Sequence, residues 1–273
     1  KVQLYKGGTA QGGPVRVTAP ATELNFTAAI QAEGAGSYTF AVQAVGNGTT
    51  WSDSAWSAPN ATAYEYTPGG GSVTGTMDIG GVTGKDPASN QSGTGWTWTA
   101  NTATLALDSS YGGGPIAINC QSTDTINLVY SGNVSIASTA SSALYCKGSL
   151  SITGSGGTLT IDSRSQDPWH VAVDVRVLAI GGNAQVNAES ANSGTNPYAV
   201  VIYGQNGVTV TDSASLTTVA TGDDASGIWV ERGDITISTT GTVTANGKGT
   251  GGGLGIHNGK KLDMSSGSLA LTG

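Results

Sequence analysis

The sequence predicts an all-β protein whose larger part, residues 96–273, is a right-handed parallel β-helix. Three observations support this fold class. Glycine accounts for 43 of the 273 residues and only 11% of residues are charged, against about a quarter in ordinary globular domains. Apolar residues make up 37% of the chain and alternate with polar ones, as in half-buried strands, and no stretch has helical spacing. Apolar pairs also recur roughly every 27 residues in this part of the chain.

Residues 1–67 carry short alternating runs at 2–6, 24–28 and 38–44, separated by glycines where hairpins would turn. Short strands at such spacing are typical of a β-sandwich. The segments VQLYKGG, YTFAVQAVGNGTTWSDSAWSAP and YEYTP resemble the second half of a fibronectin type III-like domain of bacterial surface proteins. The resemblance implies a partial module that serves as a spacer or binding module. The family's first two strands do not precede Lys1, so we expect that they were removed or that another segment replaces them.

Residues 68–95 are rich in Gly, Ser, Thr, Asn and Pro, which favours a linker. Within this stretch, residues 73–79 are compatible with a single strand. The β-helix is then expected to begin with a first coil or cap at 95–108. This tryptophan-opened stretch resembles the start of β-helix regions in secreted proteins of gut-dwelling Gram-positive bacteria.

The repeat is defined by apolar-x-apolar pairs that follow a turn. They are Ile126-x-Leu128, Leu150-x-Ile152, Leu178-x-Ile180, Val208-x-Val210, Ile235-x-Ile237 and Leu262-x-Met264. Another apolar position follows about six residues later in most coils. A further short strand precedes each pair: Ile116-Ala117-Ile118, Leu144-Tyr145-Cys146, Val171-Ala172-Val173, Val201-Ile202-Tyr203, Ile228-Trp229-Val230 and Leu254-Gly255-Ile256. Three short strands per coil predict a roughly triangular cross-section and six or seven coils.

Stacking is what makes such coils stable, because one coil cannot bury its own inward residues. Coils stacked about 4.8 Å apart bury a continuous apolar column. The right-handed sense follows from the strong preference of parallel crossovers. The repeat is still in progress at residues 268–273, so we expect further coils, or a partner, beyond that point.

Charge and composition exclude several functions. The net charge is −7, and the longest basic run is Lys260-Lys261, so nucleic-acid binding is not expected. No apolar run approaches the roughly 20 residues that span a bilayer. We expect neither cofactor nor metal, since His170 and His257 stand alone. The chain opens on a strand pattern rather than a signal peptide, which favours a mature extracellular protein, either secreted or at the cell surface.

One segment points to catalysis. Residues 221–228, TGDDASGI, resemble the paired-aspartate segment of polygalacturonases. The resemblance implies that Asp223 and Asp224 take part in glycoside hydrolysis, where one carboxyl group protonates the leaving oxygen and others activate water. The family's histidine has no equivalent, because His257 is displaced from its place, and no Arg-x-Lys pair follows. The alternative is a solvated turn, for which Asp and Gly are ordinary residues.

A second acidic pair follows from strand alternation, which places Trp229 and Glu231 outward. Counting back through the repeat aligns Asp174 with Glu231 two coils away, at a separation of roughly 9–10 Å. This value is near the upper end for an inverting glycosidase. A mixed outward row is also what an ordinary solvent-exposed face shows. A hydrolase or polysaccharide lyase therefore remains the alternative function.

Outward aromatic residues favour carbohydrate binding, adhesion or a rigid stalk without turnover. Tyr145 and Trp229 share one outward row, and Trp169 lies at a turn that enters the same sheet. Sugar rings stack on aromatic faces, and carboxylates such as Asp174 and Glu231 bind hydroxyl groups. The expected partner is a polysaccharide, a glycoprotein glycan, or a host or cell-surface protein. The alternative for each aromatic residue is packing beneath a long turn.

The two cysteines are 26 residues apart, which is one coil length. Cys120 and Cys146 each follow an inward apolar residue by two positions, Ile118 and Leu144. We therefore expect them to be buried neighbours in adjacent coils. A pair of thiols and a disulfide both remain open, because stacked parallel positions are close but poorly oriented for a bridge.

Overall fold

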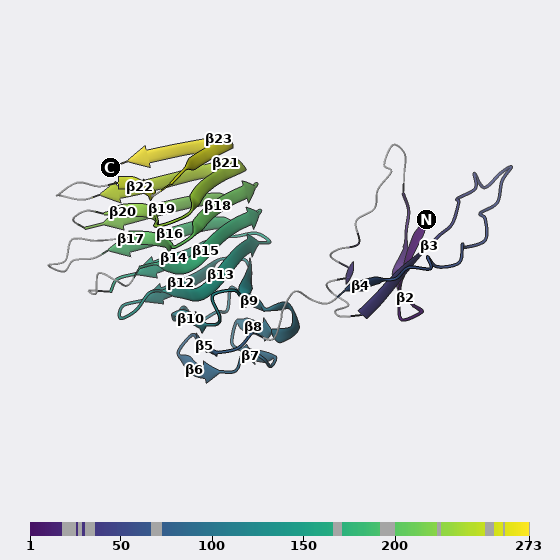
Figure 1. Ribbon diagram of the computed structural model, residues 1–273, viewed down its shortest axis with the longest axis horizontal. Coiled ribbons are helices and arrows are strands. Elements are labelled where there is room, and N and C mark those ends of the chain that lie inside the picture. The colour runs from purple at the N-terminus through teal and green to yellow at the C-terminus, as the bar shows by residue number, and fades with distance from the viewer. Residues whose placement is uncertain are drawn as a thin grey trace. The chain divides into compact units, whose positions relative to one another are not determined.

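The chain divides into two units, Lys1–Gly69 and Gly70–Gly273. The computed structural model describes residues 1–17, 26, 29–30, 36–66, 73–165, 171–191, 200–222, 225–248, 254–258 and 260–272. Nearly all regular structure in these residues is β (Figure 1). No helix within them is long and apolar enough to cross a membrane.

The first unit is a small antiparallel sheet with strand order β2-β1-β3-β4. Its strands are β1 (Val2–Lys6), β2 (Thr9–Val15), β3 (Gly36–Val42) and β4 (Tyr64–Tyr66). Leu4, Ile30 and Tyr38 are buried together, with Phe26 and Phe40 packed against them. The described residues of this unit form one sheet, so the expected sandwich of two facing sheets is not confirmed. Most of the expected strand 24–28 lies outside the described residues.

The second unit is a β-solenoid of about five turns, fewer than the six or seven expected. Three faces, each a stack of parallel strands, build it (Figure 1). The first face contains β10 (Ile116–Asn119), the starts of β13 (Leu144–Gly154) and β15 (Val173–Gly182), β17 (Val200–Gly204), β20 (Ser226–Val230) and β22 (Leu254–Asn258). The second contains β9 (Thr104–Asp108), β11 (Thr125–Ser131), the later parts of β13 and β15, β18 (Gly207–Asp212), and the starts of β21 (Asp234–Lys248) and β23 (Leu262–Thr272). The third contains β12 (Val134–Ser138), β14 (Leu159–Ser163), β16 (Gln185–Ala191), β19 (Ser215–Thr221) and the ends of β21 and β23.

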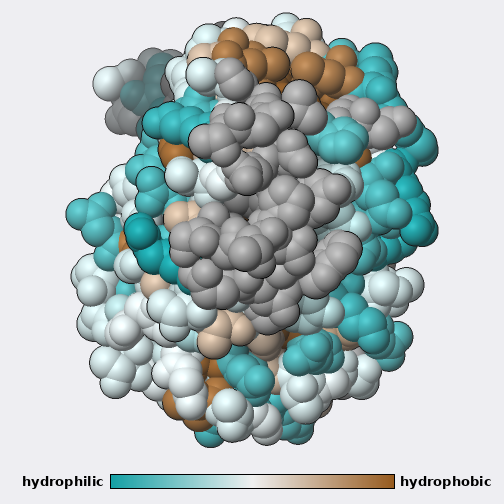
Figure 2. Space-filling model, turned by 90° about the vertical axis from the view of Figure 1, so that its left-hand side faces the viewer, coloured by the Kyte–Doolittle hydropathy of each residue, from teal (hydrophilic) through white to brown (hydrophobic). Residues whose placement is uncertain are grey.

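The expected apolar column on the second face is confirmed. Parallel pairing joins its six members in one line: Ile126, Leu150, Leu178, Val208, Ile235 and Leu262. The first five are at most 1% exposed, whereas Leu262 on the last strand is 41% exposed. Met264 and Leu271 on the same strand are exposed as well, and Figure 2 shows apolar surface at that end of the stack. The repeat spacing therefore placed the core correctly.

The register on the first face differs from the expectation in three coils. Val173 pairs with Leu144 and with Ile202, so the inward residues are Val173 and Val175, followed by Ile202 and Gly204 in the next coil. A Cβ added to Gly204 would lie 3.0 Å from the Val208 side chain. An apolar side chain is therefore disfavoured at this inward position, and the apolar pattern misplaced the strand. The last coil is shifted too, since Ile256 rather than Leu254 pairs with Ile228.

Residues 73–95 belong to the second unit instead of forming a linker. They contain β5 (Thr76–Ile79), β6 (Val82–Lys85) and β7 (Gln91–Gly93), and β8 (Trp96–Thr99) follows directly. β5 pairs antiparallel with β10, and β8 with β9. Met77, Ile79 and Trp98 lie in the solenoid core. Gly80 and Gly81, two of the glycines that suggested a linker, form the hairpin turn between β5 and β6. By pairing with β10 and β9, the hairpins cover strand edges of the first coil that would otherwise stay unpaired.

Cys120 and Cys146 lie next to each other in adjacent coils, as expected. Their Sγ atoms are 4.0 Å apart, and both are buried free thiols. The residue paired with Cys146 in the neighbouring coil is Ile118. Cys120 lies two residues after Ile118, so the two cysteines are not directly paired. Gly148 makes room there, since a Cβ on this glycine would lie only 3.0 Å from the Cys120 sulfur.

Candidate functional site

An outward row of polar and aromatic side chains runs along the first face of the solenoid. Tyr145 pairs with Asp174, Asp174 with Tyr203, Tyr203 with Trp229 and Trp229 with His257. We call these five residues the aromatic row. The first four are half-buried and His257 is exposed. Consecutive positions are about 4.8 Å apart along the stack, so the row presents one side chain per coil.

The rings at the C-terminal end of the row contact one another. The rings of Trp229 and His257 stack, with centroids 4.8 Å apart and planes inclined by 18°. Tyr203 meets Trp229 edge-on, with centroids 6.1 Å apart. Offset-stacked and edge-to-face pairs are the favoured arrangements of aromatic rings. The three side chains therefore hold one another in place and leave part of each ring exposed.

Glu231 reaches the row from the turn that follows β20. The Tyr203 hydroxyl donates a hydrogen bond of 2.6 Å to Glu231 Oε2, and Arg232 Nη2 lies 3.0 Å from Oε1. These donors stabilise the carboxylate, so the pKa of Glu231 lies below its ordinary value. Burial, the hydrogen bond to Glu231 and the nearby carboxylates raise the pKa of Tyr203 to about 12. At neutral pH the pair is thus a neutral phenol and an ionised carboxylate.

Asp174 lies between the two tyrosines of the row. Its negative charge contributes, after burial, to raising the pKa of Tyr145, and it acts in the same direction on Tyr203. The electrostatics therefore agree with the strand register. The row and the adjoining Glu231 therefore combine aromatic faces with two acidic side chains, Asp174 and Glu231.

The structure brings together most of the residues that the sequence analysis selected for carbohydrate binding. Tyr145 and Trp229 share one row, and Asp174 belongs to the same row. The expected alignment of Asp174 with Glu231 is wrong, because Asp174 is in line with Tyr203 and Trp229. Trp169, Asp223 and Asp224, like His170 and Tyr198, lie outside the described residues.

Searches among family models, curated proteins and solved structures found no match to this chain. The site must therefore be interpreted from its own geometry.

Sequence reasoning missed Tyr203 and Arg232 and assigned no binding role to His257. Tyr203 was placed inward, because Val201-Ile202-Tyr203 reads as an apolar-x-apolar pair when Gly204 is not recognised as the inward residue. Aligning Ile202 with Ile228 places Tyr203 in line with Trp229 on the outward side. This alignment would have identified Tyr203 from the sequence. Arg232 contacts its neighbour in sequence, Glu231, and the repeat pattern gives no indication of such a contact.

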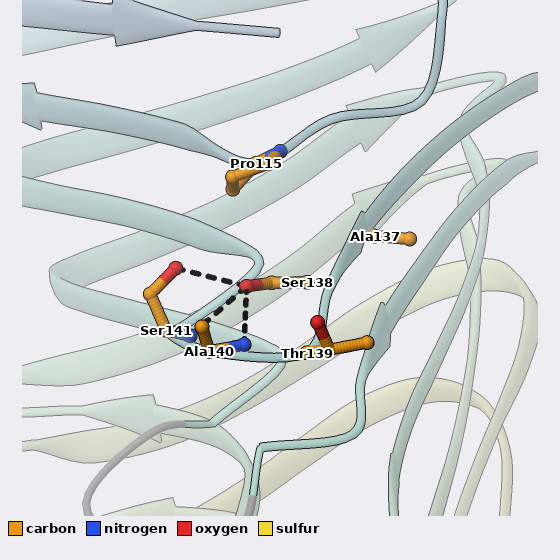
Figure 3. A pocket seen from close by; sticks show the side chains of 6 residues that line it. All are labelled: Pro115, Ala137, Ser138, Thr139, Ala140 and Ser141. Carbon is orange, nitrogen blue, oxygen red and sulfur yellow. Dashed lines mark hydrogen bonds between the residues drawn. The ribbon is translucent and has the colours of Figure 1, made fainter. Parts of the chain in front are cut away.

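A separate depression lies beside the end of β12 and has a volume of about 360 Å³. Figure 3 shows its lining residues, Pro115, Ala137, Ser138, Thr139, Ala140 and Ser141. Ser138 Oγ accepts hydrogen bonds from the backbone N–H groups of Ala140 and Ser141. A serine nucleophile needs an adjacent base, and none of the six lining residues supplies one. The Ser138 hydroxyl therefore stabilises the turn that follows β12. Across the described residues, no group of three or more His, Cys, Asp or Glu side chains could hold a metal ion.

Proposed function

We propose that the aromatic row binds an extended carbohydrate chain without cleaving it. The observation that carries the proposal is the alignment of Tyr145, Tyr203 and Trp229 in one partly exposed row, with Asp174 and Glu231 beside them. Aromatic faces attract the weakly positive C–H groups of a sugar ring through the negative face of their π-system. The carboxylates and Arg232 supply hydrogen-bond partners for hydroxyl groups.

The direction of the row favours a chain over a single sugar. Its five positions span about 19 Å along the solenoid at roughly 4.8 Å per coil. A polysaccharide lying parallel to the solenoid axis would contact several rings at once. Because Tyr203, Trp229 and His257 hold one another, less side-chain entropy is lost on binding, which favours affinity.

The charge state of Glu231 argues against a role as the general acid of a glycosidase. A glycosidase acid needs a carboxyl group that stays protonated near neutral pH, which requires a raised pKa. The pKa of Glu231 is lowered instead by Tyr203 and Arg232. A hydrolase or lyase remains the competing function, through Asp223 and Asp224 or through Asp174 and Glu231, and all four stay hypotheses.

The handedness of the solenoid, the nature of the first unit and the location of the protein belong to the same proposal. The solenoid is taken as right-handed, since nearly all parallel crossovers have that hand. The first unit is taken as a spacer of the fibronectin type III-like kind, and the protein as a secreted or surface protein of a Gram-positive bacterium. Its partner is then a polysaccharide or a glycoprotein glycan. These features rest on the repeat pattern and on the segments that resemble bacterial surface proteins.

Trp229→Ala is expected to weaken binding to a polysaccharide that the wild type retains by about five- to 150-fold. Loss of one stacking aromatic ring from a nucleic-acid site costs roughly 1–3 kcal/mol, which we use as a guide for a sugar. Affinity electrophoresis in gels containing the polysaccharide measures the change. The melting temperature should stay within a few degrees of the wild type, because the ring is half-buried at the surface.

Trp51 in the first unit provides the matched comparison, since it is 72% exposed and lies outside the row. Trp51→Ala should leave retention unchanged. Equal retention of the wild type and a folded Trp229→Ala variant would contradict the proposal, as would a loss confined to Trp51→Ala. Mass spectrometry of the recovered polysaccharide tests turnover. Shortened chains that disappear with Asp223→Asn, Asp224→Asn or Glu231→Gln would establish the enzyme instead.

A further inference from the structure

Cys120 and Cys146 form a pair that the proposed function does not use. Cys120 follows β10 at the start of a turn, and Cys146 lies on β13 in the next coil. Their sulfur atoms are 4.0 Å apart and their side chains are 3% and 0% exposed. Both point into the solenoid core, so each is the nearest reaction partner that the other has.

The turn after Cys120 lies at the surface, and side-chain hydrogen bonds hold its first two residues. Gln121 Nε2 donates to Thr74 Oγ1 over 2.9 Å, and Arg176 Nη1 donates to the Ser122 carbonyl oxygen over 2.8 Å. Gln121, Ser122 and Thr123 are exposed. A small displacement of this turn would therefore expose the Cys120 sulfur, whereas Cys146 lies within a strand that is paired on both sides.

We propose that Cys120 and Cys146 are a redox site that a disulfide oxidant converts into a disulfide bond between adjacent coils. The Cys120 thiolate attacks one sulfur of a small-molecule disulfide, whose S–S bond breaks and releases one thiol. Cys146 then attacks Cys120 Sγ in the mixed disulfide and displaces the second thiol. Two protein thiols are oxidised and one oxidant disulfide is reduced to two thiols, so electrons and protons balance.

The electrostatics of the pair agree with this order of events. The hydrogen bond from the Cys146 thiol lowers the pKa of Cys120 to about 7, and the same contact together with burial raises the pKa of Cys146. Cys120 is then the better nucleophile near neutral pH, since the thiolate is the reactive form. Cys146 is the resolving thiol.

The bond would fasten the first coil to the second. It would close a loop between residues 26 apart in sequence, next to the hairpins β5–β8 that cover the first coil. Closing a loop of this size restricts the unfolded chain. The oxidised form should melt about 5–10 °C higher than the reduced form, given the usual relation between stability and melting temperature for a unit of this size.

Incubation of the folded, full chain with oxidised glutathione tests the proposal. After denaturation and alkylation, mass spectrometry should show a monomer that has lost two hydrogen atoms and takes up no alkyl group, and a peptide that links Cys120 to Cys146. Dithiothreitol should restore both thiols and the lower melting temperature. Two alkylatable thiols, glutathione retained on both cysteines, or only intermolecular dimers would each overturn the proposal.

Two variants test the assigned order. Cys146→Ser keeps the attacking thiol and should stop at the mixed disulfide between Cys120 and glutathione. Cys120→Ser should leave Cys146 unmodified while folded. The reverse pattern, or no modification in either variant, would overturn the order. The wild-type mass measurement depends on neither variant and holds if one fails to fold.

Discussion

Replacing Ile152 with alanine is expected to destabilise the solenoid by about 2–5 kcal/mol. Ile152 is fully buried and stacks between Leu128 and Ile180 in the neighbouring coils. The substitution removes apolar contacts on both sides and leaves a cavity that the stacked strands cannot close. Urea unfolding followed by circular dichroism measures the loss, which corresponds to a fall in melting temperature of about 5–15 °C.

Ser151 is the control for this prediction, because it precedes Ile152 and points to the other side of the same strand. It pairs with Asn127 and Ala179 and is only half-buried. Ser151→Ala should change the free energy of unfolding by no more than about 0.5 kcal/mol. If both substitutions cost the same, or Ser151→Ala costs more, the inward and outward assignment of β13 is wrong.

Gly157→Ala is expected to cost at least about 3 kcal/mol, because two costs of different origin combine there. Its φ of +75° lies in the left-handed region, where a residue with a Cβ is strained. In addition, that Cβ would stand 2.2 Å from the backbone carbonyl carbon of Gly132 in the neighbouring coil. The two corners therefore approach so closely that only glycine fits at position 157.

Gly132→Ala separates the two costs. Gly132 has nearly the same φ, +73°, but its nearest contact for a Cβ is Ser109 Cβ at 3.4 Å, an ordinary distance. We expect Gly132→Ala to cost about 1–2 kcal/mol. Equal losses of stability in the two variants would mean that the coils do not approach closely at this corner.

The core column could be predicted from the sequence because inward positions tolerate few residue types. Ile126 and its five stacked equivalents repeat as apolar residues at near-constant spacing, so the pattern alone aligned them. The first face was harder, since Gly204 occupies an inward position that an apolar residue was expected to fill. Because of this one glycine, Tyr203 was predicted to point inward, and it was not included among the candidate site residues.

Contacts between different coils explain the other differences. Gly80 and Gly81, in the turn between β5 and β6, have positive φ values, and a hairpin turn has the same composition as a linker. What distinguishes the two is the pairing of β5 with β10, which lies far along the chain. Likewise, Glu231 reaches Tyr203 across 28 residues, and no local pattern indicates this hydrogen bond.

Binding of an oligosaccharide series, measured by isothermal titration calorimetry, tests the central claim about the aromatic row most directly. The series is cut from a polysaccharide that the wild type retains. Affinity should rise with chain length until the oligosaccharide covers the row, about 19 Å at one position per coil, and then level off. In Trp229→Ala the rise should be much smaller. A monosaccharide that binds as tightly as the longest chain, or a length dependence that Trp229→Ala leaves intact, would contradict the account.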